Sequence, residues 1–305
     1  MQTRRRFIAS TAAFAASAVL LPRQVFAATT LTLGDVRIDT LSDGNLVLPA
    51  DFITAGMPQP ETNTILSSYG VAGSQMTPPC NVTLLRDGTN TVLFDLGAGP
   101  DFQPSAGKLS AAMDALGVRA DDVTHVVFTH GHPDHLWGLL DEFDEPVFAN
   151  AEHMIGATEF DYWMDPGTVD TIGDARKTFA AGAARRLGVI AESARRINDG
   201  EEVLPGVAAR LTPGHTPGHL SFEIRSGSTS VMVVGDAIGN HHVAFEKPDW
   251  ATGSDQEPEL AARTRVKLMD EIATSAIPVI GYHLPDNGIG HIERKGNAYR
   301  FVRIL

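Results

Sequence analysis

Cysteine is nearly absent from this sequence. Cys80 is the single cysteine among 305 residues. One cysteine excludes an internal disulfide, so the fold depends on core packing and on any metal that it binds. Cys80 stands just before the apolar residues Val82, Leu84 and Leu85, a position that favours a buried structural residue over a reactive thiol.

Basic residues are also scarce. Lys and Arg number 24 against 37 Asp and Glu, which gives a formal net charge of −13 at pH 7. An acidic surface disfavours nucleic acid and anionic membranes as partners, because both repel it. Residues 1–27 contain four arginines and no acidic residue, so the net charge of the chain without this segment is more negative by four.

Long apolar runs are confined to the N-terminus. The stretch Ala9–Leu21 follows three arginines and precedes the small-residue cleavage pattern Val25–Ala27. It is too short for a transmembrane helix, and Thr3–Ile8 resembles a twin-arginine signal. We therefore expect residues 1–27 to be a signal peptide of the twin-arginine type. An ordinary secretory signal is the alternative.

These features predict a periplasmic or secreted protein that is not inserted in the membrane after processing. We expect residues 28–305 to form a single domain, since this length suffices for one large core.

Short apolar runs alternate with helical patterns along that domain. Strands are expected at Leu31–Ile38, Val82–Leu85, Val92–Phe94, Val126–Phe128, Ala208–Leu211, Leu220–Ile224, Val231–Val234 and Pro278–Ile280. Helices are expected at Lys108–Leu116, Ala175–Leu187 and Glu259–Ile272. Strands come first in hairpin-like groups and then alternate with helices. The order predicts an α+β fold of two mixed sheets packed face to face and covered by helices.

A histidine-rich motif follows one of the expected strands. His130, His132, Asp134 and His135 fall within six residues after Val126–Phe128. Imidazole and carboxylate groups are suitable ligands for zinc and similar divalent ions. Alternate residues of an extended segment point to one side, so His130 and His132 can share an ion. The motif therefore predicts a metal site.

This motif resembles the signature of the metallo-β-lactamase superfamily, and three later segments agree with it. Gly214–His219 resembles the second motif of the hydrolase branches, Asp236 the metal-bridging aspartate, and His283 the last ligand. The resemblance implies a four-layer αββα sandwich.

The same resemblance implies a site for two divalent metal ions. One ion would be held by His130, His132 and His215, and the other by Asp134, His135 and His283, with Asp236 between them. A metal-bridging hydroxide would attack the substrate, so Asp134 and Asp236 are the expected catalytic residues. Zn²⁺ is the expected metal, and Mn, Co and Fe stay open because these ligands suit several ions.

Within the superfamily, four segments resemble the methyl parathion hydrolase group, which is related to N-acyl-homoserine lactonases. They are Leu41–Gly44, Phe160–Trp163, Gly288–Ile292 and Gly296–Phe301. The resemblance implies an exported hydrolase, often a homodimer, that acts on small neutral lactones, esters or aryl phosphotriesters. The expected substrate pocket contains Trp163, Phe160, Phe179, Phe102 and Trp137, with ordinary core packing as the alternative interpretation.

Several alternatives stay open. Trp137 stands where the family has glycine, so it could reshape the pocket. His219 is expected to support a ligand, His241 and His242 either line the mouth of the site or face solvent, and Asp95 either orients a ligand or caps a turn. The same fold also occurs in iron-dependent, oxygen-using enzymes and could persist in a non-catalytic binding protein.

Overall fold

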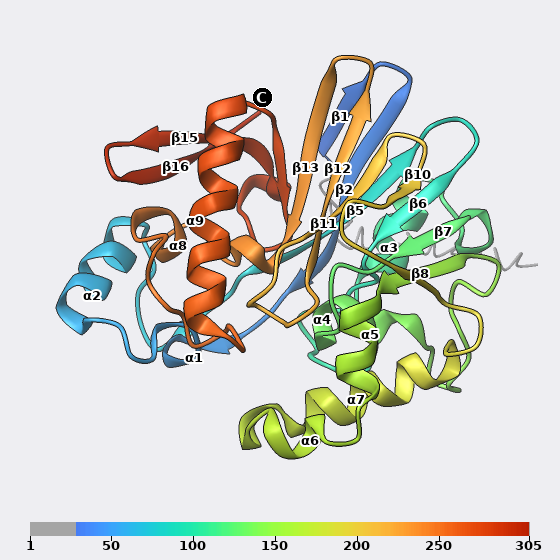
Figure 1. Cartoon of the computed structure of the whole chain (residues 1–305), viewed down its shortest axis with the longest axis horizontal. Coiled ribbons are helices and arrows are strands. Elements are labelled where there is room, and N and C mark those ends of the chain that lie inside the picture. The colour runs from blue at the N-terminus through green and yellow to red at the C-terminus, as the bar shows by residue number, and fades with distance from the viewer. Residues whose placement is uncertain (1–28, 305) are drawn as a thin grey trace, which may run out of the picture.

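Two seven-stranded sheets form the centre of the molecule, and helices cover their outer faces (Figure 1). The computed structural model describes residues 29–304, so the expected signal peptide lies outside the described residues. Among the helices of this described part, none has both the length and the apolar composition needed to cross a membrane.

The two sheets divide the chain into an N-terminal and a C-terminal half. In spatial order, the first sheet contains β1 (Thr29–Leu33), β2 (Val36–Asn45), β5 (Pro79–Arg86), β6 (Thr91–Phe94), β7 (His125–Val127), β8 (Glu152–Gly156) and β9 (Arg195–Ile197). The second contains β10 (Glu202–Leu204), β11 (Val207–Leu211), β12 (Leu220–Ser226), β13 (Thr229–Gly235), β14 (Val279–Gly281), β15 (Ile289–Lys295) and β16 (Ala298–Arg303). Neighbours are parallel from β6 to β9 and between β13 and β14, and antiparallel elsewhere. The short strands β3 (Leu48–Pro49) and β4 (Gln75–Met76) pair separately.

The helices connect and cover these sheets. The α-helices are α1 (Ala50–Thr54), α2 (Gln59–Ser68), α3 (Leu109–Ala115), α4 (Pro133–Leu136), α5 (Ala157–Met164), α6 (Thr168–Thr171), α7 (Lys177–Val189), α8 (Val243–Glu246) and α9 (Pro258–Ser275). The 3₁₀ helices are η1 (Ala120–Asp122), η2 (Trp137–Leu139), η3 (Asp174–Arg176), η4 (Asp236–Ile238) and η5 (Asp286–Gly288). Helices α3, α5 and α7 lie on the outer side of the first sheet, and α8 and α9 on that of the second (Figure 1).

The four layers follow from the alternation of side chains along each strand. In β6, Val92 and Phe94 pack between the two sheets, whereas Leu93 packs toward the helices of the first sheet. Strand β13 alternates in the same way between the first sheet and α9. The rings of Phe94 and Phe222 lie 5.3 Å apart across the interface between the sheets. The predicted four-layer αββα sandwich is confirmed.

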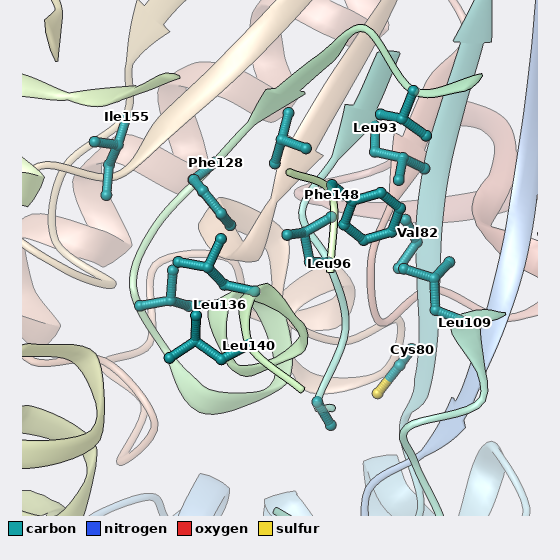
Figure 2. Packing of buried hydrophobic residues seen from close by; sticks show 14 of the residues in the cluster. Cys80, Val82, Leu93, Leu96, Leu109, Phe128, Leu136, Leu140, Phe148 and Ile155 are labelled. Atoms are coloured by element: carbon teal, nitrogen blue, oxygen red, sulfur yellow. The ribbon is translucent and has the colours of Figure 1, made fainter. Parts of the chain in front are cut away.

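The core beneath the first sheet includes the single cysteine (Figure 2). Cys80 has no exposed surface and packs among apolar side chains such as Val82, Leu93 and Leu109. Burial raises the pKa of its thiol to about 12, so the group is neutral at physiological pH. The expected burial of Cys80 is confirmed.

Some element boundaries differ from the predicted ones. The expected strand Leu31–Ile38 is a hairpin instead, since β1 ends at Leu33 and β2 begins at Val36. The turn uses Gly34 at φ 57°, a conformation in which glycine has no Cβ penalty. The predicted helices correspond to α3, α7 and α9, whereas α1, α2 and the β15–β16 hairpin were not predicted.

Candidate metal centre

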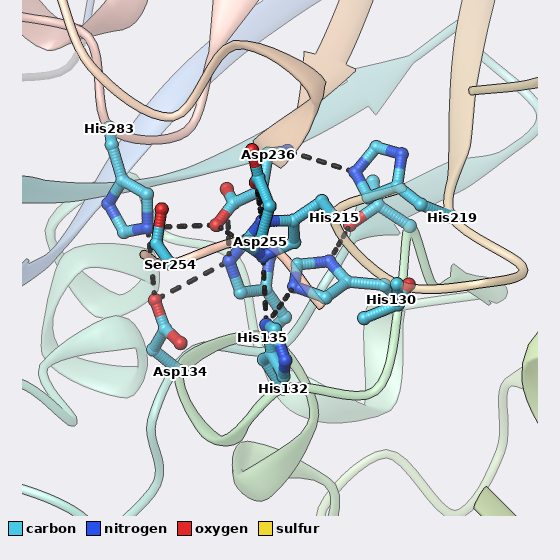
Figure 3. Close-up of polar contacts among 12 residues, drawn as sticks. His130, His132, Asp134, His135, His215, His219, Asp236, Ser254, Asp255 and His283 are labelled. Atoms are coloured by element: carbon cyan, nitrogen blue, oxygen red, sulfur yellow. Dashed lines mark hydrogen bonds and ion pairs between the residues drawn. The ribbon is translucent and has the colours of Figure 1, made fainter. Parts of the chain in front are cut away.

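The seven predicted metal ligands meet at one edge of the two sheets (Figure 3). All of them are at least nine-tenths buried: His130, His132, Asp134, His135, His215, Asp236 and His283. Four of these ligands follow β7 of the first sheet and reach into α4. The others follow strands of the second sheet, and two of them succeed β13 and β14, parallel neighbours whose carboxyl ends lie side by side.

Local geometry explains why one short motif supplies ligands in two directions. The backbone at His132 is extended, with φ −68° and ψ 157°, and Pro133 then begins α4. Proline is well suited to the first position of a helix because its fixed φ is helical and its missing N–H is not needed there. The start of the helix turns Asp134 and His135 away from the direction of His130 and His132.

Three imidazoles form the first part of the centre, which we call the three-histidine group: His130, His132 and His215. The Nδ1 atom of His132 lies 3.0 Å from His130 Nε2 and 2.8 Å from His215 Nε2. On the outer side, His215 Nδ1 donates to the Asp255 carboxylate at 2.9 Å. This bond places the ring proton on Nδ1 and leaves the lone pair of Nε2 directed at the centre.

The outer nitrogen of His132 also has a neighbour. The side-chain amide of Gln256 lies 3.1 Å from His132 Nε2. Rotation of an amide can present its oxygen to a ring N–H. Consecutive residues of one loop, Asp255 and Gln256, therefore contact two histidines of the same group, and sequence reasoning missed both. They form no motif and lie about 40 residues after His215, so only the folded loop brings them to the site.

Asp134, His135 and His283 form the second part, which we call the Asp134 group. Asp134 Oδ2 lies 3.4 Å from His135 Nε2 and 3.2 Å from His283 Nε2. The outer nitrogens are again held, since His135 Nδ1 donates to Asp95 at 2.8 Å and His283 Nδ1 to the Pro79 carbonyl at 2.7 Å. Asp95 thus orients a predicted ligand, one of the two roles expected for it.

Asp236 lies between the two groups. Its Oδ2 atom is 3.2 Å from His215 Nε2 and 3.3 Å from His283 Nε2, and its Oδ1 atom is 3.4 Å from His135 Nε2. Behind it, the backbone N–H of Asp236 donates to His219 Nε2 at 2.9 Å. His219 therefore positions the loop of Asp236, as a supporting residue would.

The donor atoms fit metal ions better than they fit one another. Among the described residues, Asp134 Oδ2, His135 Nε2 and Asp236 Oδ1 are buried without a hydrogen-bond partner. Such atoms are costly unless a partner is supplied. Lone pairs of neighbouring imidazoles would also repel without a cation between them, so the residues present suit divalent ions.

The electrostatics of the centre favour positive charge. Burial lowers the pKa of His135, but the carboxylates of Asp236, Asp134 and Asp95 outweigh this effect and raise that pKa well above its ordinary value. In His130, burial and the neighbouring histidines lower the pKa well below its ordinary value. The aspartates thus attract a cation while His130 stays a neutral ligand.

Cys80 borders this centre in a way that the sequence did not indicate. Its sulfur belongs to a compact group with the ligand atoms of Asp134 and His283, all within 4.8 Å of one another. The thiol is fully buried, so a neutral sulfur atom borders the Asp134 group.

A narrow cavity of about 60 Å³ opens over the predicted ligands. Its walls combine five of them with apolar side chains that include Phe52, Phe102 and Phe179. Two of the predicted pocket residues, Phe102 and Phe179, therefore face the centre, and their rings lie 5.9 Å apart.

The other three predicted pocket residues lie outside the lining of this cavity. Trp163 is buried against His132, with ring centroids 5.7 Å apart, and Phe160 lies on the same helix, α5. Trp137 packs against Phe102 and under the buried Arg186 guanidinium, 4.3 Å from its ring. The geometry lets Trp137 act on the pocket through Phe102.

A second, larger cavity of about 280 Å³ adjoins the first. The two share Ile53, Pro78 and the predicted ligand His283. The second cavity is more polar, because Asn240, His241 and His242 line it. Burial lowers the pKa of both histidines, that of His242 to about 3, so these two rings are neutral at neutral pH.

Comparison with known proteins gives the same assignment as the motifs. The family model described as the metallo-beta-lactamase superfamily matches residues 77–277. Metallo-beta-lactamase domain-containing protein 1 of Xenopus laevis is 32% identical over 232 residues, which cover 75% of this chain and 82% of that protein. N-acyl homoserine lactonase AttM of Azorhizobium caulinodans is 32% identical over a shorter stretch of 120 residues, 38% of this chain and 41% of that one.

Solved structures extend the similarity over nearly the whole chain. The hydrolase AbOPH of the beta lactamase superfamily has a TM-score of 0.85 and 26% identity, covering 93% of this chain and 99% of its own. AidC, a dizinc quorum-quenching lactonase, has a TM-score of 0.86 at 24% identity, covering 91% and 97%. The likeness to AidC shows a common fold.

Proposed function

The chain belongs to the metallo-β-lactamase superfamily, and from that membership we propose that it is a two-metal hydrolase of neutral lactones, esters or aryl phosphotriesters. The observation that carries the proposal is the convergence of seven buried donors beside an apolar cavity. Packing alone does not explain why three of the donor atoms in this one place, Asp134 Oδ2, His135 Nε2 and Asp236 Oδ1, are buried without a hydrogen-bond partner.

The proposed ligands divide as the two groups do. The three-histidine group would hold one divalent ion, the Asp134 group the other, and Asp236 would contact both. Two such ions, with Zn²⁺ as the expected metal, supply a polarised substrate oxygen and a water molecule activated near neutral pH.

The chain's own residues would orient the reactants. Asp134 borders the cavity and can accept a hydrogen bond or a proton from a reacting water molecule. Asp236 would hold the two groups at a fixed separation, because a hydrogen bond to His219 fixes the backbone of Asp236. Phe102 and Phe179 would contact the apolar part of the substrate and exclude bulk water from the centre.

The cavities define the substrate class more closely. A volume of about 60 Å³ is well below the several hundred Å³ of a typical ligand pocket, so a bound substrate extends beyond the metal centre. The adjoining polar cavity offers hydrogen-bonding groups from Asn240 and from the neutral rings of His241 and His242. Both features favour an uncharged substrate with one apolar and one polar end, and the relative AttM bears the name of a lactonase.

Three further parts of the proposal come from the sequence. The N-terminal segment 1–27 would direct export to the periplasm or beyond, the remaining chain would form one domain, and the enzyme would be a homodimer. N-terminal sequencing of the secreted protein and its mass in solution test these statements.

An assay with three substrates tests the proposed function. The purified protein is depleted of metal, reconstituted with Zn²⁺, and given an aryl ester, an acyl-homoserine lactone and an aryl phosphotriester. We expect metal-dependent hydrolysis of at least one, and loss of the second bound ion in Asp236→Ala. Oxygen consumption with bound iron would favour the oxygen-using alternative, and two bound ions without turnover would favour a binding protein.

A further inference from the structure

Glu159 carries a buried carboxylate that lies outside the predicted ligand set. It belongs to α5, and its side chain has no exposed surface. Its Oε1 atom accepts hydrogen bonds from the Gly131 backbone N–H at 2.9 Å and from Trp163 Nε1 at 2.6 Å. Its Oε2 atom accepts from Thr216 Oγ1 at 2.7 Å and from the Gly218 N–H at 3.0 Å.

Three of these donors, two backbone N–H groups and the Thr216 hydroxyl, belong to the two loops that supply the three-histidine group. Gly131 lies between His130 and His132, and Thr216 directly follows His215. One carboxylate therefore joins the loop after β7 to the loop before β12. It also holds the indole of Trp163, which packs against His132.

The hydrogen-bond partners of Glu159 match a group that accepts on both of its oxygens. Backbone and indole N–H groups can only donate, and they occupy both of its oxygens. Burial raises the pKa of this carboxyl above its ordinary value, and the four hydrogen bonds lower it only in part. A fully paired buried carboxylate is a strong anchor, because charge-assisted hydrogen bonds are about twice as strong as neutral ones.

The glycines of both loops show how closely the loops press on this part of α5. A Cβ atom at Gly131 would lie 2.4 Å from Trp163 Nε1. A Cβ atom at Gly218 would lie 2.1 Å from the backbone nitrogen of Glu159 itself. Both contacts are too short for any side chain, so the two loops meet α5 at the smallest possible distance.

We propose that Glu159 is a positioning residue that sets the separation of the two loops and so the affinity of the three-histidine group for its ion. It makes no hydrogen bond to the Asp134 group among the described contacts, so one ion depends on it more than the other. This inference rests on the proposed two-metal function.

Stepwise metal affinity of Glu159→Gln tests the inference. The isosteric amide keeps the volume but lacks the charge and half of the acceptor capacity. We expect the native protein to bind two Zn²⁺ in competition with a chelator. In Glu159→Gln, one ion should bind about 10- to 100-fold more weakly, the range for loss of a group that orients ligands, while the other keeps its affinity.

Asp43→Asn is the matched control. Asp43 is also a buried carboxylate that accepts backbone N–H groups, from Ala98, Gly107 and Leu109. Ala98 and Gly107 lie in the segment between β6 and α3, Leu109 begins α3, and none of the three is a neighbour in sequence of a predicted ligand. Its variant should lose stability and leave both Zn²⁺ affinities unchanged.

The outcomes separate the inference from the proposed function. Two outcomes would overturn the positioning role and leave the hydrolase proposal intact. One is that Glu159→Gln binds both ions with native affinity. The other is that Glu159→Gln and Asp43→Asn each lose the same affinity for both ions. A native protein without bound Zn²⁺ would overturn both. If Glu159→Gln does not fold, Thr216→Val removes one donor and keeps the carboxylate. We then expect the affinity of the three-histidine group for its ion to fall about two- to tenfold, and an unchanged affinity would contradict the inference.

Discussion

At the scale of single residues, the centre depends on pairs of an inner donor and an outer anchor. His215 is paired with Asp255, His135 with Asp95, and His283 with the Pro79 carbonyl. The sequence predicted the inner donors, because they cluster in motifs of recognisable spacing. Among the anchors, Asp95 was expected either to orient a ligand or to cap a turn. Asp255 and Pro79 come from distant loops and belong to residue types that are common on any surface, so no local pattern identifies them.

Asp255→Asn should weaken the ion of the three-histidine group. Asp255 fixes the tautomer of His215 and also accepts a hydrogen bond from the buried Arg265 at 3.3 Å. We expect about a 10- to 100-fold loss of metal affinity, measured by chelator competition. The surface variant Asp270→Asn is the control, since Asp270 pairs with Arg294 in solvent, where such pairs contribute little to stability. Equal metal affinity in the two variants would contradict this role for Asp255.

Trp137 stands where the family has glycine, and it can affect the substrate pocket only through its contact with Phe102. Its ring supports Phe102 and fills the space above Gly182, where a Cβ atom would lie 2.3 Å from the indole. Trp137→Phe should raise KM for aryl substrates while leaving the metal content unchanged, because Phe102 loses its support. An unaltered substrate preference would show that Trp137 only packs the core.

At the scale of elements, strand ends decide the position of each ligand. The alternation of side chains predicted the sandwich, since it states which face of each strand is buried. Periodicity did not predict α1, which has five residues, or α2, whose ten residues include only two large apolar side chains, Ile65 and Leu66. Their placement nevertheless shapes the pocket, to which Phe52 and Ile53 of α1 contribute.

Asp39 offers a test of stability at the element scale. It lies on β2 with no exposed surface and accepts hydrogen bonds from Thr30, Arg37 and Arg86, which join β1, β2 and β5. Burial raises its pKa, but these hydrogen bonds outweigh burial and place the pKa below the ordinary value of 3.8.

A carboxyl with a lowered pKa in the folded state stabilises the fold above its unfolded pKa and loses that effect as the pH falls. Asp39→Asn should therefore cost about 1–3 kcal/mol at pH 7, and the difference should shrink below about pH 4. Urea unfolding of the metal-free proteins at several pH values measures this. A difference that is constant down to pH 3 would mean that the charge of Asp39 is not what stabilises the sheet.

At the scale of the whole molecule, two sheets that are far apart in sequence share one centre. The first sheet supplies four predicted ligands and the second supplies three, so bound metal would connect the halves of the sandwich. The bound cations would also offset the negative charge of the buried carboxylates Asp134 and Asp236. Sequence motifs predicted the family and the fold, whereas the pocket walls depend on loops whose packing no local pattern describes.

Metal removal should lower the stability of the entire fold. A ligand that binds only the folded state stabilises it by about 4 kcal/mol at a thousandfold excess over its dissociation constant. We expect a chelator to lower the melting temperature and Zn²⁺ to restore it, as calorimetry would show. An identical melting temperature with and without chelator would argue against metal bound across the two sheets.

The most direct test of the two-metal centre is titration of the metal-free protein with Zn²⁺ while hydrolysis of an acyl-homoserine lactone and an aryl ester is followed. We expect activity to rise until two equivalents are bound and then to level off. Full activity without metal, or no binding of Zn²⁺ to the protein, would contradict a two-metal hydrolase.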